Sequence, residues 1–215
     1  MRIHQDIFAN SRPLWEKMLD HPFLRETAAG SIPFDVFANW LNQDYLFVRE
    51  AIPFIAIMVS RAPHALRPGL AAAIPALQSE LELFERMARE KGVSLREEMT
   101  PICHAYVQYL IATAHSRSFE EGFTLLYCAE KAYFDCWSTV RRTLTSASPW
   151  KDFIDRWSNE SFAAWVKWLE DEIDKLLERA SETLRQQMAA VFLTTTRYEY
   201  LFWDIAFQGE SWPDA

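Results

Sequence analysis

Apolar residues recur three and four positions apart along most of the chain, which is the spacing that places them on one face of an α-helix. A clear run begins after residue 33, with Phe34, Phe37, Trp40, Leu41, Tyr45 and Val48. No segment alternates apolar and polar residues between turn signals, as a half-buried strand would. Only five glycines interrupt the 215 residues. The sequence therefore predicts an all-α protein.

Helix-stopping residues divide this pattern into separate helices. Gly30 and Gly92 each follow a periodic segment, at the place where a glycine in the left-handed conformation commonly ends a helix. The chain contains no low-complexity linker and no internal repeat, so we expect one domain over residues 1–215. The pattern predicts about eight or nine helices, over 8–19, 21–29, 34 onward, 70–91, 101–114, 119–144, 150–157, 159–180 and 182–207.

Three of these helices have recognisable starting residues. Thr100 precedes Pro101, an order typical of an N-cap followed by proline at the first helical position. Ser118 and Glu121 have the spacing of a capping box, in which each side chain accepts a hydrogen bond from the other residue's backbone N–H. Asn159, or its neighbour Ser158, is predicted to cap the helix that follows.

The charge of the chain argues against two classes of partner. The net charge is −8 and the isoelectric point is near 5.2, and no run of lysine or arginine occurs. Nucleic-acid-binding proteins present a basic face, and an anionic membrane repels an acidic protein on average. We therefore expect neither nucleic acid nor a membrane surface as a partner.

The cysteines and the apolar segments indicate the compartment. The three cysteines, Cys103, Cys128 and Cys136, form no C-x-x-C pair that would suggest zinc or a redox centre. The opening MRIHQDIF lacks the apolar core of a secretory signal. The most apolar stretch, 51–60, is too short to cross a bilayer. We expect a cytoplasmic protein with reduced thiols.

Several common catalytic motifs are absent. The chain has no glycine-rich phosphate loop, no H-E-x-x-H and no G-x-S-x-G. Its five histidines never form the Glu-x-x-His pair of a di-iron carboxylate bundle. We interpret Glu80, Glu82 and Glu85 as acids on a helix surface. The sequence predicts no metal centre.

Two carboxylates lie among aromatic residues inside otherwise apolar helices. Asp44 occurs in WLNQDYLFV, although aspartate has poor helix propensity and is rarely buried unpaired; it either binds a ligand or hydrogen-bonds a neighbouring helix. Glu199 occurs in TTTRYEYLFWDIAF. Burial among rings raises the pKa of a carboxyl and suits it to donate a proton near neutrality; the alternative is an ion pair with Arg197 or another arginine.

A third segment, LLYCAEKAYFDCW, combines a carboxylate, a tyrosine and a thiol. On a helix that turns ~100° per residue, Glu130 and Tyr133 lie ~60° apart, whereas Cys128 lies ~140° from Tyr133. Glu130 and Tyr133 can therefore face one cavity together, and Cys128 points elsewhere. Glu130 could instead form an ion pair, for example with Arg86 or Arg142.

Taken in order, these segments resemble the TenA/thiaminase II family. HPFLRETAAGSIPFDVFANWLNQDYLF, at 21–47, resembles the family's opening: H-P-F, a G-x-[IL]-P turn and Q-D-Y on the next helix. RYEYLFWDIAF, at 197–207, resembles its closing E-x-x-F-W element. AEKAYFDCW, at 129–137, resembles the middle helix of the branch that lacks the active-site cysteine. The resemblance implies a heme-oxygenase-like helical bundle without heme, assembled as a homodimer or homotetramer.

The resemblance also implies roles for individual residues. Asp44 corresponds to the aspartate that holds the polar edge of an aminopyrimidine ring, and Glu199 to the acid/base that also contacts the ring. Tyr133 and Tyr106 correspond to tyrosines that pack against it. Trp157 stands where the better-known members tend to have a tyrosine. We expect Trp157 or Phe47 to stack on the substrate.

One departure from the family changes the expected substrate. Ala129 occupies the position of the catalytic cysteine, four residues before the tyrosine. Members with this departure resemble the present chain in having a glutamate on the same helix, here Glu130, and are associated with thiamin pyrimidine salvage instead of thiamin cleavage. The resemblance thus implies hydrolysis of 4-amino-5-aminomethyl-2-methylpyrimidine or its N-formyl derivative, with Glu130 activating water. No metal or organic cofactor is expected. The alternative is a non-catalytic protein of the same fold that binds a pyrimidine or pyrimidine phosphate.

Overall fold

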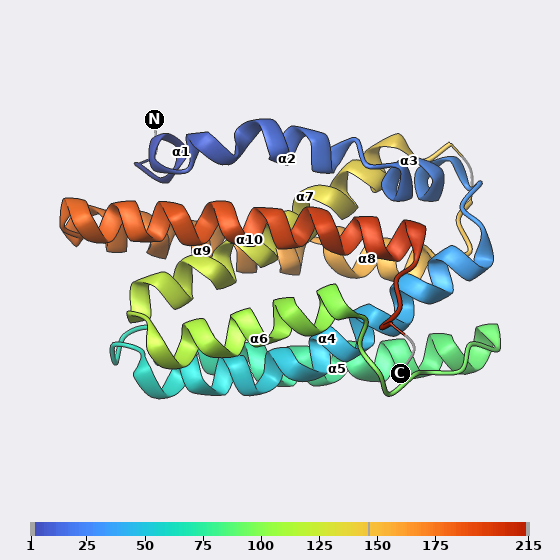
Figure 1. Cartoon of the computed structure of the whole chain (residues 1–215), viewed down its shortest axis with the longest axis horizontal. Coiled ribbons are helices and arrows are strands. Elements are labelled where there is room, and N and C mark those ends of the chain that lie inside the picture. Colours follow the sequence, from blue (N-terminus) through green and yellow to red (C-terminus); the bar gives the residue numbers. More distant parts are fainter. Residues whose placement is uncertain (1–2, 146, 214–215) are drawn as a thin grey trace. The chain divides into compact units, whose positions relative to one another are not determined.

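The computed structural model describes residues 3–145 and 147–213, and within these ranges it contains helices and no strand (Figure 1). The elements are α1 (Ile3–Ile7), the short 3₁₀ helix η1 (Ala9–Ser11), α2 (Arg12–Leu19), α3 (Pro22–Ala29), α4 (Phe34–Arg61), α5 (Arg67–Lys91), α6 (Pro101–Ser116), α7 (Phe119–Thr143), α8 (Lys151–Ser158), α9 (Glu160–Arg179) and α10 (Glu182–Gln208). The predicted all-α class is confirmed. The five-residue α1 was not predicted, and the helix expected over 8–19 begins with η1.

The chain forms two compact units, each assembled from segments that are far apart in sequence. Unit 1 comprises Met1–Pro33 and Phe123–Trp203, and unit 2 comprises Phe34–Gly122 and Asp204–Ala215. Helices α7 and α10 contribute residues to both units. The expectation of one domain over residues 1–215 stays a prediction.

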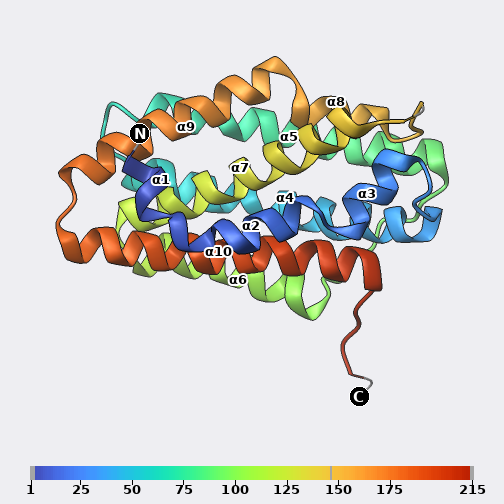
Figure 2. The same ribbon diagram turned by 90° about the horizontal axis from the view of Figure 1, so that it is seen from above.

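Unit 1 has a core dominated by large rings. Helix α9 packs against α8 and against α1 (Figure 2). The fully buried large side chains of unit 1 include Phe23, Tyr127, Trp137, Phe153 and Trp203. Each large ring buries much apolar area, so these aromatic side chains dominate the core of unit 1.

Unit 2 is organised around α4. Both α5 and α6 pack on this helix (Figure 1), and its buried stripe includes Phe37, Trp40, Leu41, Phe54 and Met58. No helix of the described residues is both long enough and apolar enough to pass through a membrane.

The local signals for helix ends are mostly confirmed. Gly30 and Gly92 follow α3 and α5 with φ of 70°, the left-handed region that glycine adopts without a Cβ clash. The Ser118 N–H donates to Glu121 Oε2 at 3.0 Å and the Glu121 N–H donates to Ser118 Oγ at 3.2 Å, which is the predicted capping box. Asn159 Oδ1 accepts from the N–H of Phe162 at 2.8 Å and caps α9.

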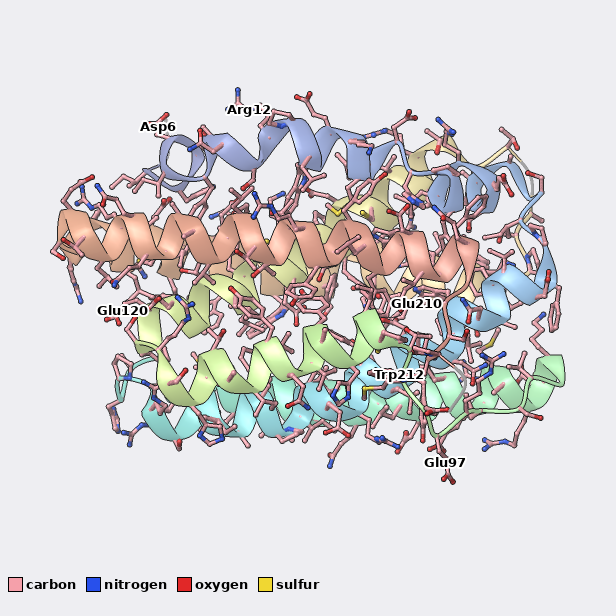
Figure 3. The ribbon with its side chains drawn as sticks, viewed as in Figure 1. Asp6, Arg12, Glu97, Glu120, Glu210 and Trp212 are labelled. Carbon is pink, nitrogen blue, oxygen red and sulfur yellow. The ribbon has the colours of Figure 1, made fainter. Side chains whose placement is uncertain are left out.

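The prediction for Thr100 is wrong in part. Thr100 occupies the N-cap position of α6, but its side chain makes no capping hydrogen bond. The carboxylate of Glu210 instead accepts from the Ile102 N–H at 2.9 Å, and Trp212 Nε1 donates to the Met99 carbonyl at 2.9 Å. Figure 3 labels the side chains of Glu210 and Trp212. The C-terminal segment of unit 2 therefore holds the start of α6.

The prediction for the acids of α5 is also wrong for one of them. Glu80, expected on a helix surface, is buried at 5% exposure. Glu82 is exposed as expected, and Glu85 is half-buried and accepts from the Tyr45 hydroxyl at 3.4 Å. The helical period places residues on a face, but the packing partner of that face decides which of them are covered.

Candidate functional site

The residues predicted to form the site belong to both units. Unit 2 contains Asp44, Phe47 and Tyr106, and unit 1 contains Glu130, Tyr133, Trp157 and Glu199.

In unit 2, Asp44 lies on α4 and has no exposed surface. The two residues before it bind the segment that leads into α6. Asn42 Oδ1 accepts from the Arg96 N–H at 2.6 Å, and Gln43 Oε1 accepts from the Thr100 N–H at 2.9 Å. The polar residues 42–44 of α4 therefore bind the segment before α6, through Asn42 and Gln43, and also include the carboxylate of Asp44.

Cys103 on α6 is a buried neighbour of Asp44. Its thiol lies 3.6 Å from the Gln43 carbonyl oxygen. Burial raises the pKa of the Cys103 thiol far above its ordinary value, and the negative charges of Asp44 and Glu210 raise it further. Since a thiolate would lie beside two carboxylates, Cys103 is held as a neutral thiol.

The aromatic members of the unit 2 group are in contact. The rings of Phe47 on α4 and Tyr106 on α6 are 4.8 Å apart between centroids, with planes inclined by 40°. Tyr106 is buried and Phe47 is half-buried. Asp44 and Phe47 are three residues apart, so they lie on neighbouring sides of α4.

In unit 1, Tyr133 on α7 lies against two tryptophans. Its ring is 5.6 Å from that of Trp157 on α8, edge to face, and 5.6 Å from that of Trp203 on α10, with planes inclined by 29°. Trp157 also stacks on Trp137 at 5.5 Å. Tyr133 is half-buried whereas the three tryptophans are buried, so Tyr133 is the partly accessible member of an aromatic cluster.

Glu199 lies on the part of α10 that belongs to unit 1, and only 1% of its surface is exposed. Burial raises the pKa of the Cys128 and Cys136 thiols well above the ordinary value, and the charge of Glu199 contributes to both shifts. Among the described residues, the exposed Arg197 makes no ion pair, so the alternative pairing of Glu199 with Arg197 is not realised. The Glu199 carboxylate lies close to the Cys128 and Cys136 thiols, which their raised pKa values keep neutral.

Cys128 is packed into the core of unit 1 and not presented at its surface. It is 0% exposed, and its sulfur lies 3.5 Å from both the Phe192 carbonyl oxygen and Thr196 Oγ1 on α10. Ala129 and Glu130, the next residues of α7, are half-buried. The nucleophile of cysteine enzymes is the thiolate, so a buried thiol with a raised pKa is unsuited to that role.

Sequence reasoning missed some of this environment. The anchoring role of Asn42 and Gln43 carries no local signal, because the backbone groups that they bind are more than fifty residues away. The contact between Tyr133 and Trp203 had a signal that could have been used: Trp203 follows Glu199 by four residues, and residues four apart share a helix face.

Comparisons with known proteins place this chain in a family. The sequence profile of the TENA/THI-4/PQQC family matches residues 8–209. The chain is 38% identical to a TenA homologue of known structure from Pyrococcus furiosus, with a TM-score of 0.92 over 94% of this chain and 98% of that one. It is 26% identical to the aminopyrimidine aminohydrolase of Helicobacter pylori, over 97% of this chain and 100% of that protein.

This chain belongs to the TENA/THI-4/PQQC family. The fold also matches a domain of unknown function with a heme-oxygenase-like fold from Shewanella denitrificans, with a TM-score of 0.74 over 96% of each chain. At 14% identity this second likeness shows the fold alone. The predicted family and the predicted heme-oxygenase-like fold are confirmed.

Proposed function

We propose that this protein is an aminopyrimidine aminohydrolase that acts in the salvage of thiamin-derived pyrimidines. Its substrate is 4-amino-5-aminomethyl-2-methylpyrimidine or the N-formyl derivative. The observation that carries the proposal is the burial of the Glu199 carboxyl beside apolar and thiol groups. Burying a carboxylate costs free energy, and a side chain with a purely structural role at this position would not need a carboxyl group. Family membership and the names of several relatives give further support.

The proposed roles divide between orienting the ring and moving protons. Asp44 accepts a hydrogen bond from the exocyclic amine, and Tyr106 and Phe47 contact the ring. Tyr133 and Trp157 pack against the substrate from their aromatic cluster. An ionised carboxylate can only accept hydrogen bonds, and a carboxyl can donate one only while it is protonated, so the two kinds of role need different surroundings.

The reaction itself needs one base and one acid. Glu130 takes a proton from a water molecule, whose oxygen bonds to the carbon that carries the leaving nitrogen. The carbon–nitrogen bond breaks, and Glu199 donates a proton to that nitrogen, which leaves as ammonia from the aminomethyl compound. With the N-formyl derivative, water attacks the formyl carbon and formate is released. Proton transfer by placed side chains contributes about 10²–10⁴-fold to such rates.

The test is to incubate purified protein with the aminomethyl pyrimidine, its N-formyl derivative and thiamin, and to follow ammonia, formate and thiazole release. We expect turnover of a pyrimidine and its loss in Glu130→Gln. Glu178→Gln, which neutralises an exposed acid on α9, is the matched control and should keep full activity. Binding of a pyrimidine without turnover, unaffected by Glu130→Gln, would favour the non-catalytic alternative.

We further propose that the protein acts in the cytoplasm as a homodimer or homotetramer. The three cysteines are free, in keeping with a reducing compartment. Light scattering coupled to size-exclusion chromatography tests the assembly, because a monomer mass near 25.1 kDa would contradict it.

A further inference from the structure

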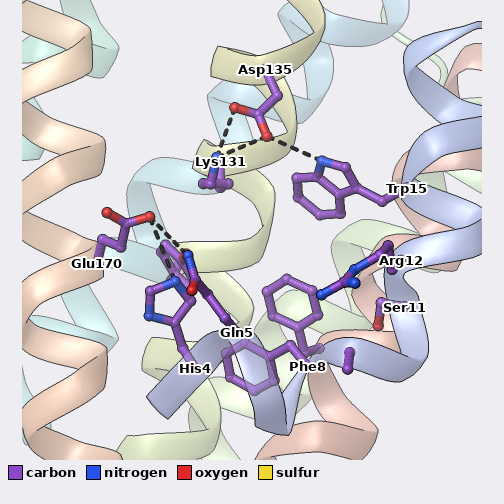
Figure 4. Close-up of a pocket in the computed structure, with 12 residues that line it drawn as sticks. His4, Gln5, Phe8, Ser11, Arg12, Trp15, Lys131, Asp135 and Glu170 are labelled. Atoms are coloured by element: carbon purple, nitrogen blue, oxygen red, sulfur yellow. Dashed lines mark hydrogen bonds and ion pairs between the residues drawn. The ribbon is translucent and has the colours of Figure 1, made fainter. Parts of the chain in front are cut away.

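Unit 1 contains a cavity that none of the predicted site residues lines (Figure 4). Its volume is about 440 Å³, and its walls come from α1, η1, α2, α7, α9 and α10. Ligand pockets of proteins commonly have volumes of about 300–1,000 Å³. The side chains that matter for what it could hold are Phe8, Arg12, Trp15, Lys131, Glu170 and Phe192.

One wall of the cavity is a set of nearly parallel rings. Phe8 stacks on Phe192 with 4.1 Å between centroids and 5° between planes. Trp15 stacks on the same Phe192 at 5.7 Å and 18°. Phe8 and Phe192 are buried, whereas Trp15 is half-buried. A planar molecule that enters the cavity can therefore continue an existing stack.

The accessible ring of this wall is held in a fixed orientation. Trp15 Nε1 donates to Asp135 Oδ2 at 3.1 Å. The Lys131 ammonium in turn donates to both oxygens of Asp135, at 2.7 and 2.8 Å (Figure 4). A ring fixed before a ligand arrives loses little rotational freedom on binding, which favours affinity.

The charged side chains around the cavity lie close to a polar partner, with the exception of Arg12. Lys131 and Asp135 form an ion pair, and Glu170 lies 3.6 Å from His4 Nε2. Arg12, by contrast, is exposed, and its side chain makes no hydrogen bond or ion pair with any residue that the structure describes. Its side chain extends toward Phe8 from the side of the pocket opposite Glu170 (Figure 4).

We propose that this cavity is a second ligand site, which takes a planar aromatic molecule bearing a carboxylate. The ring lies against Trp15 and Phe8, and the carboxylate meets the guanidinium of Arg12, whose paired N–H groups match a carboxylate in geometry. The Lys131 ammonium is already paired with Asp135, and Glu170 repels an anion, so the carboxylate of the ligand is directed to the Arg12 end. This inference does not depend on the proposed hydrolase activity.

The experiment compares three compounds that share one ring and differ in charge. Indole-3-acetate, indole-3-ethanol and tryptamine are titrated into the full-length protein by calorimetry. We expect indole-3-acetate to bind at least about tenfold more tightly than the neutral and cationic compounds, a factor that corresponds to about 1.4 kcal/mol. Binding of tryptamine as tight as that of indole-3-acetate would overturn the proposal, and so would the absence of binding by all three.

Variants locate the site. Arg12→Gln should weaken indole-3-acetate about tenfold and remove its advantage over indole-3-ethanol, because it removes one charge-assisted contact. Arg179→Gln removes the charge of another exposed arginine, which lies outside the cavity, and should leave all three affinities unchanged. Trp15→Leu should weaken all three compounds, with circular dichroism confirming the fold.

A last variant separates this site from the hydrolase residues. Glu199→Gln should bind indole-3-acetate as the wild type does, because Glu199 does not line the cavity. If Glu199→Gln lost the binding, or if Arg12→Gln kept it, the compound would be bound elsewhere and the proposal would be wrong.

Discussion

The two buried carboxylates of the candidate site, Asp44 in unit 2 and Glu199 in unit 1, are equally hidden from solvent but differently surrounded. Asp44 follows Asn42 and Gln43, whose side chains bind the backbone of the segment before α6. The polar neighbours of Glu199 on α10, Thr195 and Thr196, donate to carbonyls of their own helix at 2.9 Å.

This difference suggests different roles for Asp44 and Glu199. The α4 side chains beside Asp44 connect it to a loop and hold it in a defined place, which suits a residue that orients a ring. The hydroxyls beside Glu199 are satisfied within α10, and thiols with raised pKa values lie close to its carboxyl. Such surroundings suit a residue that exchanges a proton with the substrate.

The largest expected effect is that of Glu199→Gln. The substitution keeps the size of the side chain and removes its acid, so kcat should fall by about 10²–10⁴-fold. Thermal stability should not fall, because a buried amide costs less to desolvate than a buried carboxylate. Initial rates and melting curves measure the two quantities, and a melting temperature well below that of the wild type would show that Glu199 is structural.

Asp44→Asn should act on binding more than on the chemical step. A hydrogen bond to a charged group contributes about 1.5–3 kcal/mol, so kcat/KM should fall by about 10–150-fold. Most of that loss should appear in KM if Asp44 orients the ring in the ground state. An unchanged KM with a collapsed kcat would contradict the proposed division of roles.

Alkaline pH should destabilise the fold through the buried thiols. The folded-state pKa values of Cys103, Cys128 and Cys136 are raised, whereas an unfolded cysteine titrates near about 8.5. Above that pH the unfolded chain loses protons that the folded chain keeps, so the free energy of unfolding falls as pH rises.

The slope of this effect is at most about 1.4 kcal/mol per pH unit for each thiol. Urea denaturation at several pH values between neutrality and about pH 10 measures it, and Cys136→Ala should show a shallower decline than the wild type. Unchanged stability across this range would mean that the thiols are not held neutral in the folded protein.

The smallest effect is expected from Glu210→Ala in unit 2. The Glu210 carboxylate accepts from the Ile102 N–H at the start of α6, and removing such a cap costs about 0.5–2 kcal/mol. Urea denaturation should show this loss, whereas Glu97→Ala, an exposed acid in the segment before α6, should be neutral. Equal effects of the two variants would indicate that Glu210 has no special role.

The parts of the structure that the sequence predicts are those governed by local geometry. Gly30, Gly92 and the Ser118–Glu121 pair mark helix ends because their conformations and hydrogen bonds involve nearby residues. Helical spacing separates Cys128 from Glu130 for the same reason. Thr100 was misinterpreted as a side-chain cap because the group that binds the start of α6, Glu210, is over a hundred residues further on.

The cavity beside Trp15 could not be predicted from the sequence, because it too depends on residues that are far apart along the chain. Its walls come from helices at both ends of unit 1's sequence, and α1 is too short to show a helical period. The family resemblance did not help, because it concerns other residues. For the candidate site, the residues named from the sequence and the family resemblance stay a prediction, and the structure adds the contacts that they make within each unit.

The most direct test of the account measures ammonia released from 4-amino-5-aminomethyl-2-methylpyrimidine, beside thiazole released from thiamin, by the wild type and by Cys128→Ser. We predict rapid ammonia release, little thiamin cleavage, and a Cys128→Ser variant that keeps most of the wild-type rate, because the Cys128 thiol is buried and protonated. Complete loss of activity in Cys128→Ser, or cleavage of thiamin as fast as that of the aminopyrimidine, would contradict the account.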